Sequence, residues 1–206
     1  FNDWADLGYD AHVKRTSRRP LVTGEVTPRE ALAVGAGLAL CAFALVLFTN
    51  RATIVLAVAA LAISIAYPFF KRFFALPQAF LGIAFSFGIP MAFASVRGEV
   101  EWPGWPMLAI NLLWVMAYDT EYAMVDRDDD VRIGMRTSAI TFGRFDIAAI
   151  AISYAGYLAG MAWVGRLMVL GPVYYAGLVA ALGCACYHLW LIRDRDREAC
   201  FRAFLH

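Results

Sequence analysis

Histidine and cysteine are scarce in this sequence, and neither is spaced as a metal or catalytic site requires. There are three scattered histidines, and four cysteines that lack the paired spacing of a zinc site. Three of the cysteines, Cys41, Cys184 and Cys186, fall inside apolar runs, which indicates packing. The formal net charge is only +1, so the charge as a whole does not attract nucleic acid. These absences leave a zinc module, a histidine-centred site and a nucleic-acid-binding domain without support.

The 206 residues also contain no repeat of fixed period, no low-complexity tract and no linker long enough to divide the chain. We therefore expect residues 1–206 to form a single domain. The chain begins at Phe1, in a segment that does not resemble a signal peptide, so we expect that part of the protein precedes it.

Apolar residues, in contrast, are abundant. They make up 61% of the chain, whereas a soluble domain has about half. Six runs are long and apolar enough to cross a bilayer as helices. They cover residues 30–49, 52–67, 76–96, 104–124, 146–165 and 167–192, with Pro68 expected at the mouth of the second. This pattern predicts an all-α, multi-span transmembrane helical bundle with six full spans.

The basic residues between these runs are distributed unevenly. If the six spans alternate in direction, 15 of the 18 Lys and Arg residues fall on one side of the membrane and three on the other. Arg51, Arg97 and Arg166 are the three exceptions. Because basic loops accumulate on the cytoplasmic side, the split supports the span count and predicts that the basic face is cytoplasmic.

Two acidic clusters lie at the predicted cytoplasmic ends of helices. At 100° per residue, Asn2, Asp6 and Asp10 share one helix face. The residues of a second series also share one helix face, because their side chains fall within about 80° around the helix axis. This series consists of Asp119, Tyr122, Asp126 and Asp130, with Glu121, Asp128 and Asp129 around it.

Carboxylates this dense repel one another and are costly beside a membrane unless a cation is present. Oxygen ligands favour magnesium or calcium, and magnesium commonly combines one or two carboxylates with waters and phosphate oxygens. We therefore predict two Mg²⁺ ions, one per cluster, bridged by the diphosphate of a prenyl diphosphate. The alternative for either cluster is a charged helix end that only faces water.

Basic residues near both clusters are candidates for holding the diphosphate oxygens. Those favoured are Lys14, Arg15, Lys71 and Arg72. Arg18 and Arg19 are more typical of positive anchors at a membrane surface.

The same segments resemble a known family. The segment N-D-W-A-D-L-G-Y-D-A-H-V-K-R-T, from Asn2, is similar to the first motif of UbiA-type membrane prenyltransferases. The segment Y-D-T-E-Y-A-M-V-D-R-D-D-D-V-R-I-G, from Tyr118, resembles the subgroup of bacterial 4-hydroxybenzoate polyprenyltransferases. Y-P-F-F-K-R from Tyr67 and W-L-I-R-D-R from Trp190 are similar to the same subgroup. Residues 136–138 depart from it, with R-T-S where K-S-T is expected.

The resemblance implies Mg²⁺-dependent transfer of a polyprenyl chain from polyprenyl diphosphate to 4-hydroxybenzoate, ortho to its hydroxyl, in ubiquinone biosynthesis. It puts one metal on Asn2, Asp6 and Asp10 and the other on Asp126 and Asp130, with Asp119 and Tyr122 completing the second motif. It also implies a multi-pass protein of the bacterial inner membrane that opens toward the cytoplasm. Family members have about nine spanning helices, so we expect the chain to lack N-terminal helices, with part of the acceptor pocket, and the last helix.

In the expected mechanism the diphosphate departs and the electron-rich ring attacks the allylic cation in a dry helical cavity. Asp119 is a candidate to orient or deprotonate the phenol. Eight phenylalanines could line the cavity, although packing is the better interpretation for most of them. They are Phe69, Phe70, Phe73, Phe74, Phe80, Phe85, Phe87 and Phe93.

Two alternatives remain. A related prenyltransferase could use another acceptor, such as homogentisate, a naphthoate or haem. A cation transporter would use acids as an ion pathway, but no apolar run carries a mid-span acid suited to a relay.

Overall fold

The computed structural model describes residues Phe1–His206 and contains helices but no strands. The predicted all-α bundle is therefore confirmed. The helices, in chain order, are α1 (Asn2–Ala5), α2 (Leu7–Asp10), α3 (Pro20–Thr23), α4 (Pro28–Val46), α5 (Arg51–Phe70), α6 (Pro77–Ser86), α7 (Gly88–Arg97), α8 (Gly104–Ile133), α9 (Ser138–Phe142), the 3-10 turn η1 (Gly143–Phe145), α10 (Asp146–Leu167), α11 (Pro172–Ile192) and α12 (Arg197–Leu205).

Local sequence signals set several of these boundaries. Thr27 forms a capping box with Glu30 at the start of α4, and Asn50 accepts the Thr53 backbone N–H at the start of α5. Pro68 does not lie at the mouth of α5 as predicted, because the helix continues to Phe70. A proline in the last turn removes one backbone hydrogen bond without stopping the helix.

The predicted number of apolar spans is corrected from six to five. Five helical segments are long and apolar enough to cross a membrane. The fourth predicted span, residues 104–124, lies within the 30-residue helix α8, which is not among them. α8 carries many polar residues on faces that neighbouring helices cover. Its mean hydropathy therefore need not be as high as that of a helix that faces lipid.

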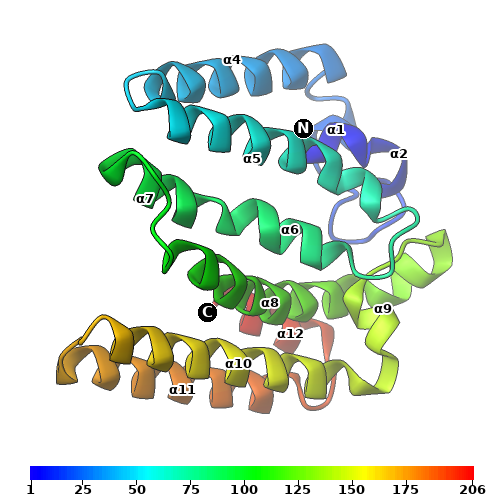
Figure 1. Cartoon of the computed structure of the whole chain (residues 1–206). Coiled ribbons are helices and arrows are strands. Elements are labelled where there is room, and N and C mark those ends of the chain that lie inside the picture. The colour runs from blue at the N-terminus through cyan, green and yellow to red at the C-terminus, as the bar shows by residue number, and fades with distance from the viewer.

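The helices are arranged around α8. Figure 1 shows the α4–α5 hairpin on one side, the α10–α11 hairpin on the other, and α6–α7 beside α8. α8 packs against α6, α7, α10 and α12. Gly156 and Gly160 allow the close approach of α10, since a Cβ atom at either position would meet Leu113 or Ile110 of α8 at 2.8 and 2.6 Å.

Four segments rich in Lys and Arg meet at the end of the bundle where α1, α2 and α9 lie (Figure 1). They are Lys14–Arg19, Lys71–Arg72, Arg127–Arg144 and Arg193–Arg202. The Lys71 carbonyl accepts the Arg136 backbone N–H at 3.0 Å, and Arg197 pairs with Asp129 at 3.2 Å. Asp129 also accepts the backbone N–H of Lys14. The segments that the charge pattern assigned to one face are thus together in space.

Candidate active site

A cavity of about 570 Å³ opens between the N-terminal segment and helices α5, α6 and α8. Its lining is polar where the acidic clusters lie and mostly apolar along α6. Most of the predicted site residues line it, namely Asn2, Asp6, Asp10, Arg15, Lys71, Asp119, Tyr122, Asp126 and Asp130. Residues far apart in the sequence therefore contribute to one site.

The first acidic cluster is held by a helix that is interrupted at Asp6. α1 ends before Asp6 and α2 begins after it, yet Asp6 N–H donates to the Asn2 carbonyl and Asp10 N–H donates to the Asp6 carbonyl. This four-residue spacing keeps all three side chains on the cavity side, as the helical phase predicted.

The second cluster lies on the uninterrupted helix α8. Asp119, Tyr122, Asp126 and Asp130 all line the cavity. Asp128, in contrast, is exposed. The two remaining acids face elsewhere: Asp129 pairs with Arg197, and Glu121 accepts a hydrogen bond from the Tyr154 hydroxyl at 2.9 Å.

Three cations pair with the acids of the cavity. Arg15 binds Asp126 at 2.6 Å, and its guanidinium carbon lies 4.3 Å from the centre of the Tyr122 ring. Lys71 binds Asp6 at 3.0 Å. The third cation is Arg19, considered below, and all three are within reach of an anion that enters the cavity.

The structure does not bring the two other predicted basic residues to the cavity. The Lys14 side chain is exposed and does not line it. Arg72 instead donates to the Ala5 carbonyl at 2.9 Å and lies over the ring of Tyr9. Arg72 thus supports the segment that carries the first cluster.

Sequence reasoning missed Arg19, Tyr67 and Gln78, which also line the cavity. Arg19 binds Asp10 at 2.8 Å and Asp3 at 2.7 Å, although its position suggested a membrane anchor. The sequence offered one signal for Tyr67, which opens the Y-P-F-F-K-R segment. The sequence offered no such signal for Gln78, which is an uncharged residue at the start of a helix.

The oxygens of both clusters fit a divalent cation. Asn2 Oδ1, Asp6 Oδ1 and Asp126 Oδ1 are buried without a hydrogen-bond partner, which is costly for a polar atom. No group of three or more His, Cys, Asp or Glu side chains is close enough to hold an ion by itself. Magnesium suits such sparse sites, because it commonly keeps waters and substrate oxygens among its ligands.

Burial also disfavours the ionised form of two acids in the site. It raises the pKa of Asp130 to about 7, and the negative charge of Asp126 acts in the same direction. Burial raises the pKa of Asp10 as well, although Arg19 opposes the shift. A bound divalent cation would reverse this preference.

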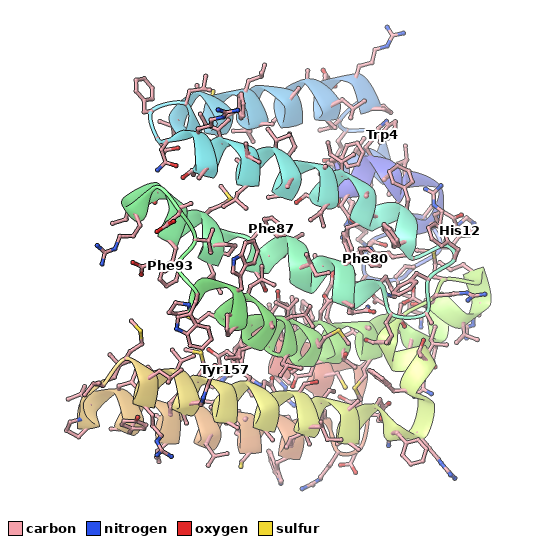
Figure 2. All side chains as sticks on the ribbon, in the orientation of Figure 1. Trp4, His12, Phe80, Phe87, Phe93 and Tyr157 are labelled. Atoms are coloured by element: carbon pink, nitrogen blue, oxygen red, sulfur yellow. The ribbon has the colours of Figure 1, made fainter.

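Apolar side chains of α6 form one wall of the cavity. Leu81, Ala84 and Phe85 line it with the three- and four-residue spacing of a single helix face. Phe85 is the only one of the eight phenylalanines considered above that does so. Phe80 instead stacks on Phe70, and Figure 2 shows Phe93 at the end of the bundle opposite His12. Packing is thus the role of most of them, as predicted.

A helical membrane bundle with paired acid clusters and cations around one cavity has the features of an enzyme that acts on a diphosphate. The model of the UbiA prenyltransferase family matches residues 1–206, and the chain belongs to this family.

Named relatives are similar over the whole chain. The 4-hydroxybenzoate octaprenyltransferase of Cupriavidus necator is 63% identical over 205 residues, which cover 100% of this chain and 72% of the relative. The protein of the same name from Nitrosospira multiformis is 58% identical over 205 residues, again 100% of this chain and 71% of the relative.

Two solved structures share the fold. The UbiA homolog from Aeropyrum pernix K1 superposes with a TM-score of 0.85 at 27% identity, covering 99% of this chain and 78% of the homolog. A digeranylgeranylglyceryl phosphate synthase has a TM-score of 0.66 at 19% identity, covering 99% and 72%, and supports the fold alone.

Proposed function

We propose that this protein transfers a polyprenyl chain from polyprenyl diphosphate to the ring carbon of 4-hydroxybenzoate ortho to its hydroxyl, a step of ubiquinone biosynthesis. The observation that carries the proposal is the pairing of the two acid clusters across one cavity, with Arg15, Arg19 and Lys71 between them. The names of relatives that match the entire chain support the acceptor.

The proposed donor site uses both clusters. Asn2, Asp6 and Asp10 would hold one Mg²⁺, and Asp126 and Asp130 the other. Bound magnesium would neutralise charge on the departing diphosphate and so stabilise the leaving group.

The three cations of the cavity act on the same diphosphate. Arg15, Arg19 and Lys71 are already paired with acids, so they are held in place before the substrate arrives. Preorganised charge of this kind stabilises a transition state more effectively than groups that must first reorient.

In the proposed reaction the bond between the allylic carbon and the diphosphate oxygen breaks. A carbon–carbon bond forms at the ring, and the ring carbon loses its proton, so diphosphate and a proton are released. Asp119 would accept a hydrogen bond from the phenolic hydroxyl, which would increase the electron density of the ring. Leu81, Ala84 and Phe85 would line the path of the isoprenoid chain and keep water from the cation.

The proposed location is the bacterial inner membrane, with the cavity open to the cytoplasm. The five apolar helical segments indicate a multi-pass membrane protein. The cavity lies at the basic end of the bundle, and basic segments prefer the cytoplasmic side.

Incubation of the protein in membrane vesicles with labelled polyprenyl diphosphate, Mg²⁺ and a panel of acceptors tests the proposal. We expect a prenylated product with 4-hydroxybenzoate and none after chelation of Mg²⁺. A product only with homogentisate, a naphthoate or haem would overturn the acceptor. Cation flux without any transfer would instead support the transporter.

A further inference from the structure

A buried glutamine connects the cavity to the helices behind it. Gln78 lies in the first turn of α6 and lines the cavity with only 4% of its surface exposed. Its Oε1 accepts the backbone N–H of Ser138, at the start of α9, at 2.9 Å. A backbone N–H can only donate, so the contact fixes which end of the amide faces Ser138. The NH₂ group must therefore point the other way.

A second hydrogen bond ties this pair to α8. The Ser138 hydroxyl lies 2.8 Å from the Thr120 hydroxyl, which also donates to the Met116 carbonyl. Ser138 and Thr120 are 0% and 1% exposed, so no water competes for these groups. Gln78 is thus locked to the turn of α8 that carries Asp119.

The acid nearest in sequence to this hydrogen-bonded group is Asp119, the residue before Thr120. Gln78 and Asp119 line the same cavity, and Ser138 joins Gln78 to Thr120, the residue that follows Asp119 on α8. Lys71 and Arg15 are paired with Asp6 and Asp126 instead of with Asp119. Asp119 also lies seven residues before Asp126 on α8, about 10 Å farther along the helix. Asp119 therefore lines the cavity at a different level of α8 from Asp126, and it has no ion pair of its own.

We propose that Gln78 is a positioning residue for the aromatic acceptor: held by Ser138, its NH₂ group fixes the Asp119 carboxylate so that one oxygen receives the acceptor hydroxyl. This inference rests on the proposed function, because it requires an acceptor that carries a hydroxyl group. It assigns to α6 a polar role besides its apolar wall.

Two substitutions separate this role from simple packing. Gln78→Met removes both polar ends while keeping the length of the side chain. Gln78→Glu keeps an oxygen that can accept the Ser138 N–H, but it replaces the NH₂ donor with a group that repels Asp119. If Gln78 served only to join α6 to α9, the glutamate variant would behave like the wild type.

The chain offers a matched control on the same two helices. Asn111 of α8 donates to the Ser86 hydroxyl of α6 at 3.0 Å, and neither residue lines the cavity. Asn111→Leu therefore removes a polar contact between α6 and α8 without touching the site. Thermal unfolding of all variants reports any general loss of stability.

The experiment measures KM separately for the acceptor and for polyprenyl diphosphate, with the whole protein in membrane vesicles. We expect both Gln78 variants to raise the acceptor KM about tenfold, the usual effect of one hydrogen bond, with the donor KM within about twofold. Asn111→Leu should change neither value.

Three results would overturn the positioning role. These are wild-type kinetics in Gln78→Glu, equal increases of both KM values in the Gln78 variants, or an acceptor KM raised as much by Asn111→Leu. Failure of the proposed function is distinguishable, because it would appear in the wild type as no product from 4-hydroxybenzoate. The Gln78 test would then be repeated with the acceptor that the panel identifies.

Discussion

Asp6 and Asp126 face the cavity from opposite clusters with the same arrangement of their carboxylate oxygens. In each, Oδ2 lies on a cation, Lys71 or Arg15, while Oδ1 is buried without a partner. The cation holds the side chain, and the free oxygen is available to a metal. An amide at either position would keep the shape but remove the charge on which both interactions depend.

We predict that Asp126→Asn lowers prenyl transfer at least about a hundredfold, since it removes a charge from the proposed diphosphate site. The measurement is product formation from labelled donor at saturating Mg²⁺. Asp128→Asn is the matched control, because Asp128 lies on the same helix but is exposed. It should retain activity within about twofold, and an equal loss in both variants would contradict the assignment of Asp126.

Arg18 and Arg19 provide a second contrast between neighbours. Arg19 lines the cavity and bridges Asp3 and Asp10, whereas Arg18 is exposed. We predict that Arg19→Gln raises the KM for polyprenyl diphosphate about tenfold through loss of a charge-assisted contact. Arg18→Gln should leave it nearly unchanged. Similar kinetics of the two variants would remove Arg19 from the site.

The sequence could not separate these two arginines, for a physical reason. Helical phase predicts direction only where a regular helix continues, and residues 11–19 form a series of turns. On α8 the phase holds, so it correctly directs Asp119, Asp126 and Asp130 to one cavity. Gln78 depends on a contact with Ser138, sixty residues away, which no local pattern contains.

At the scale of elements, α8 shows why a hydropathy criterion can leave out a central helix: residues 104–124 form an apolar run, yet α8 is not among the five apolar segments. Hydropathy identifies helices whose surfaces contact lipid, and α4, with no buried residue, is an extreme case. α8 contacts other helices on most of its surface, so polar side chains are tolerated where they face the cavity or find partners. The helices that carry the chemistry are for this reason harder to recognise as spans.

A buried ion cluster joins the elements at the basic end. Asp146, at the start of α10, is 0% exposed and binds Arg127 of α8 at 3.2 Å and Arg195 of the α11–α12 turn at 2.6 Å. Arg195 also has a left-handed backbone, with φ of 54°, and donates to the Arg144 carbonyl. The cluster therefore stabilises the turn at Arg195, where a left-handed backbone is unfavourable for a residue other than glycine.

We predict that Asp146→Asn lowers stability by about 2 kcal/mol, less than for a fully buried pair because both arginines are partly exposed. The measurement is thermal unfolding in detergent, with a decrease of several degrees expected. Asp194→Asn is the control, since Asp194 and its partner Arg193 are both exposed. Unfolding temperatures that agree for the two variants would show that the cluster does not brace this end.

At the scale of the whole molecule, the basic segments and the cavity lie at the same end of the bundle. Lys71 links both features, because it binds Asp6 in the cavity while its carbonyl accepts the Arg136 N–H. Arg51, Arg97 and Arg166 lie at helix ends on the other side. In the proposed function, the charge asymmetry that orients the protein would therefore also determine which compartment supplies the magnesium.

We predict that a membrane-impermeant chelator stops transfer only when the basic end faces the medium. In inverted inner-membrane vesicles, loaded with both substrates and Mg²⁺, added EDTA should abolish product formation; in right-side-out vesicles it should have little effect. Arg18→Cys and Arg97→Cys report the orientation through an impermeant maleimide, which should label the first only in inverted vesicles and the second only in right-side-out ones. Cys41, Cys184 and Cys186 are exposed on the apolar helices α4 and α11, where lipid would shield them from the reagent. Loss of transfer to EDTA in right-side-out vesicles would mean that the cavity opens on the opposite side of the membrane.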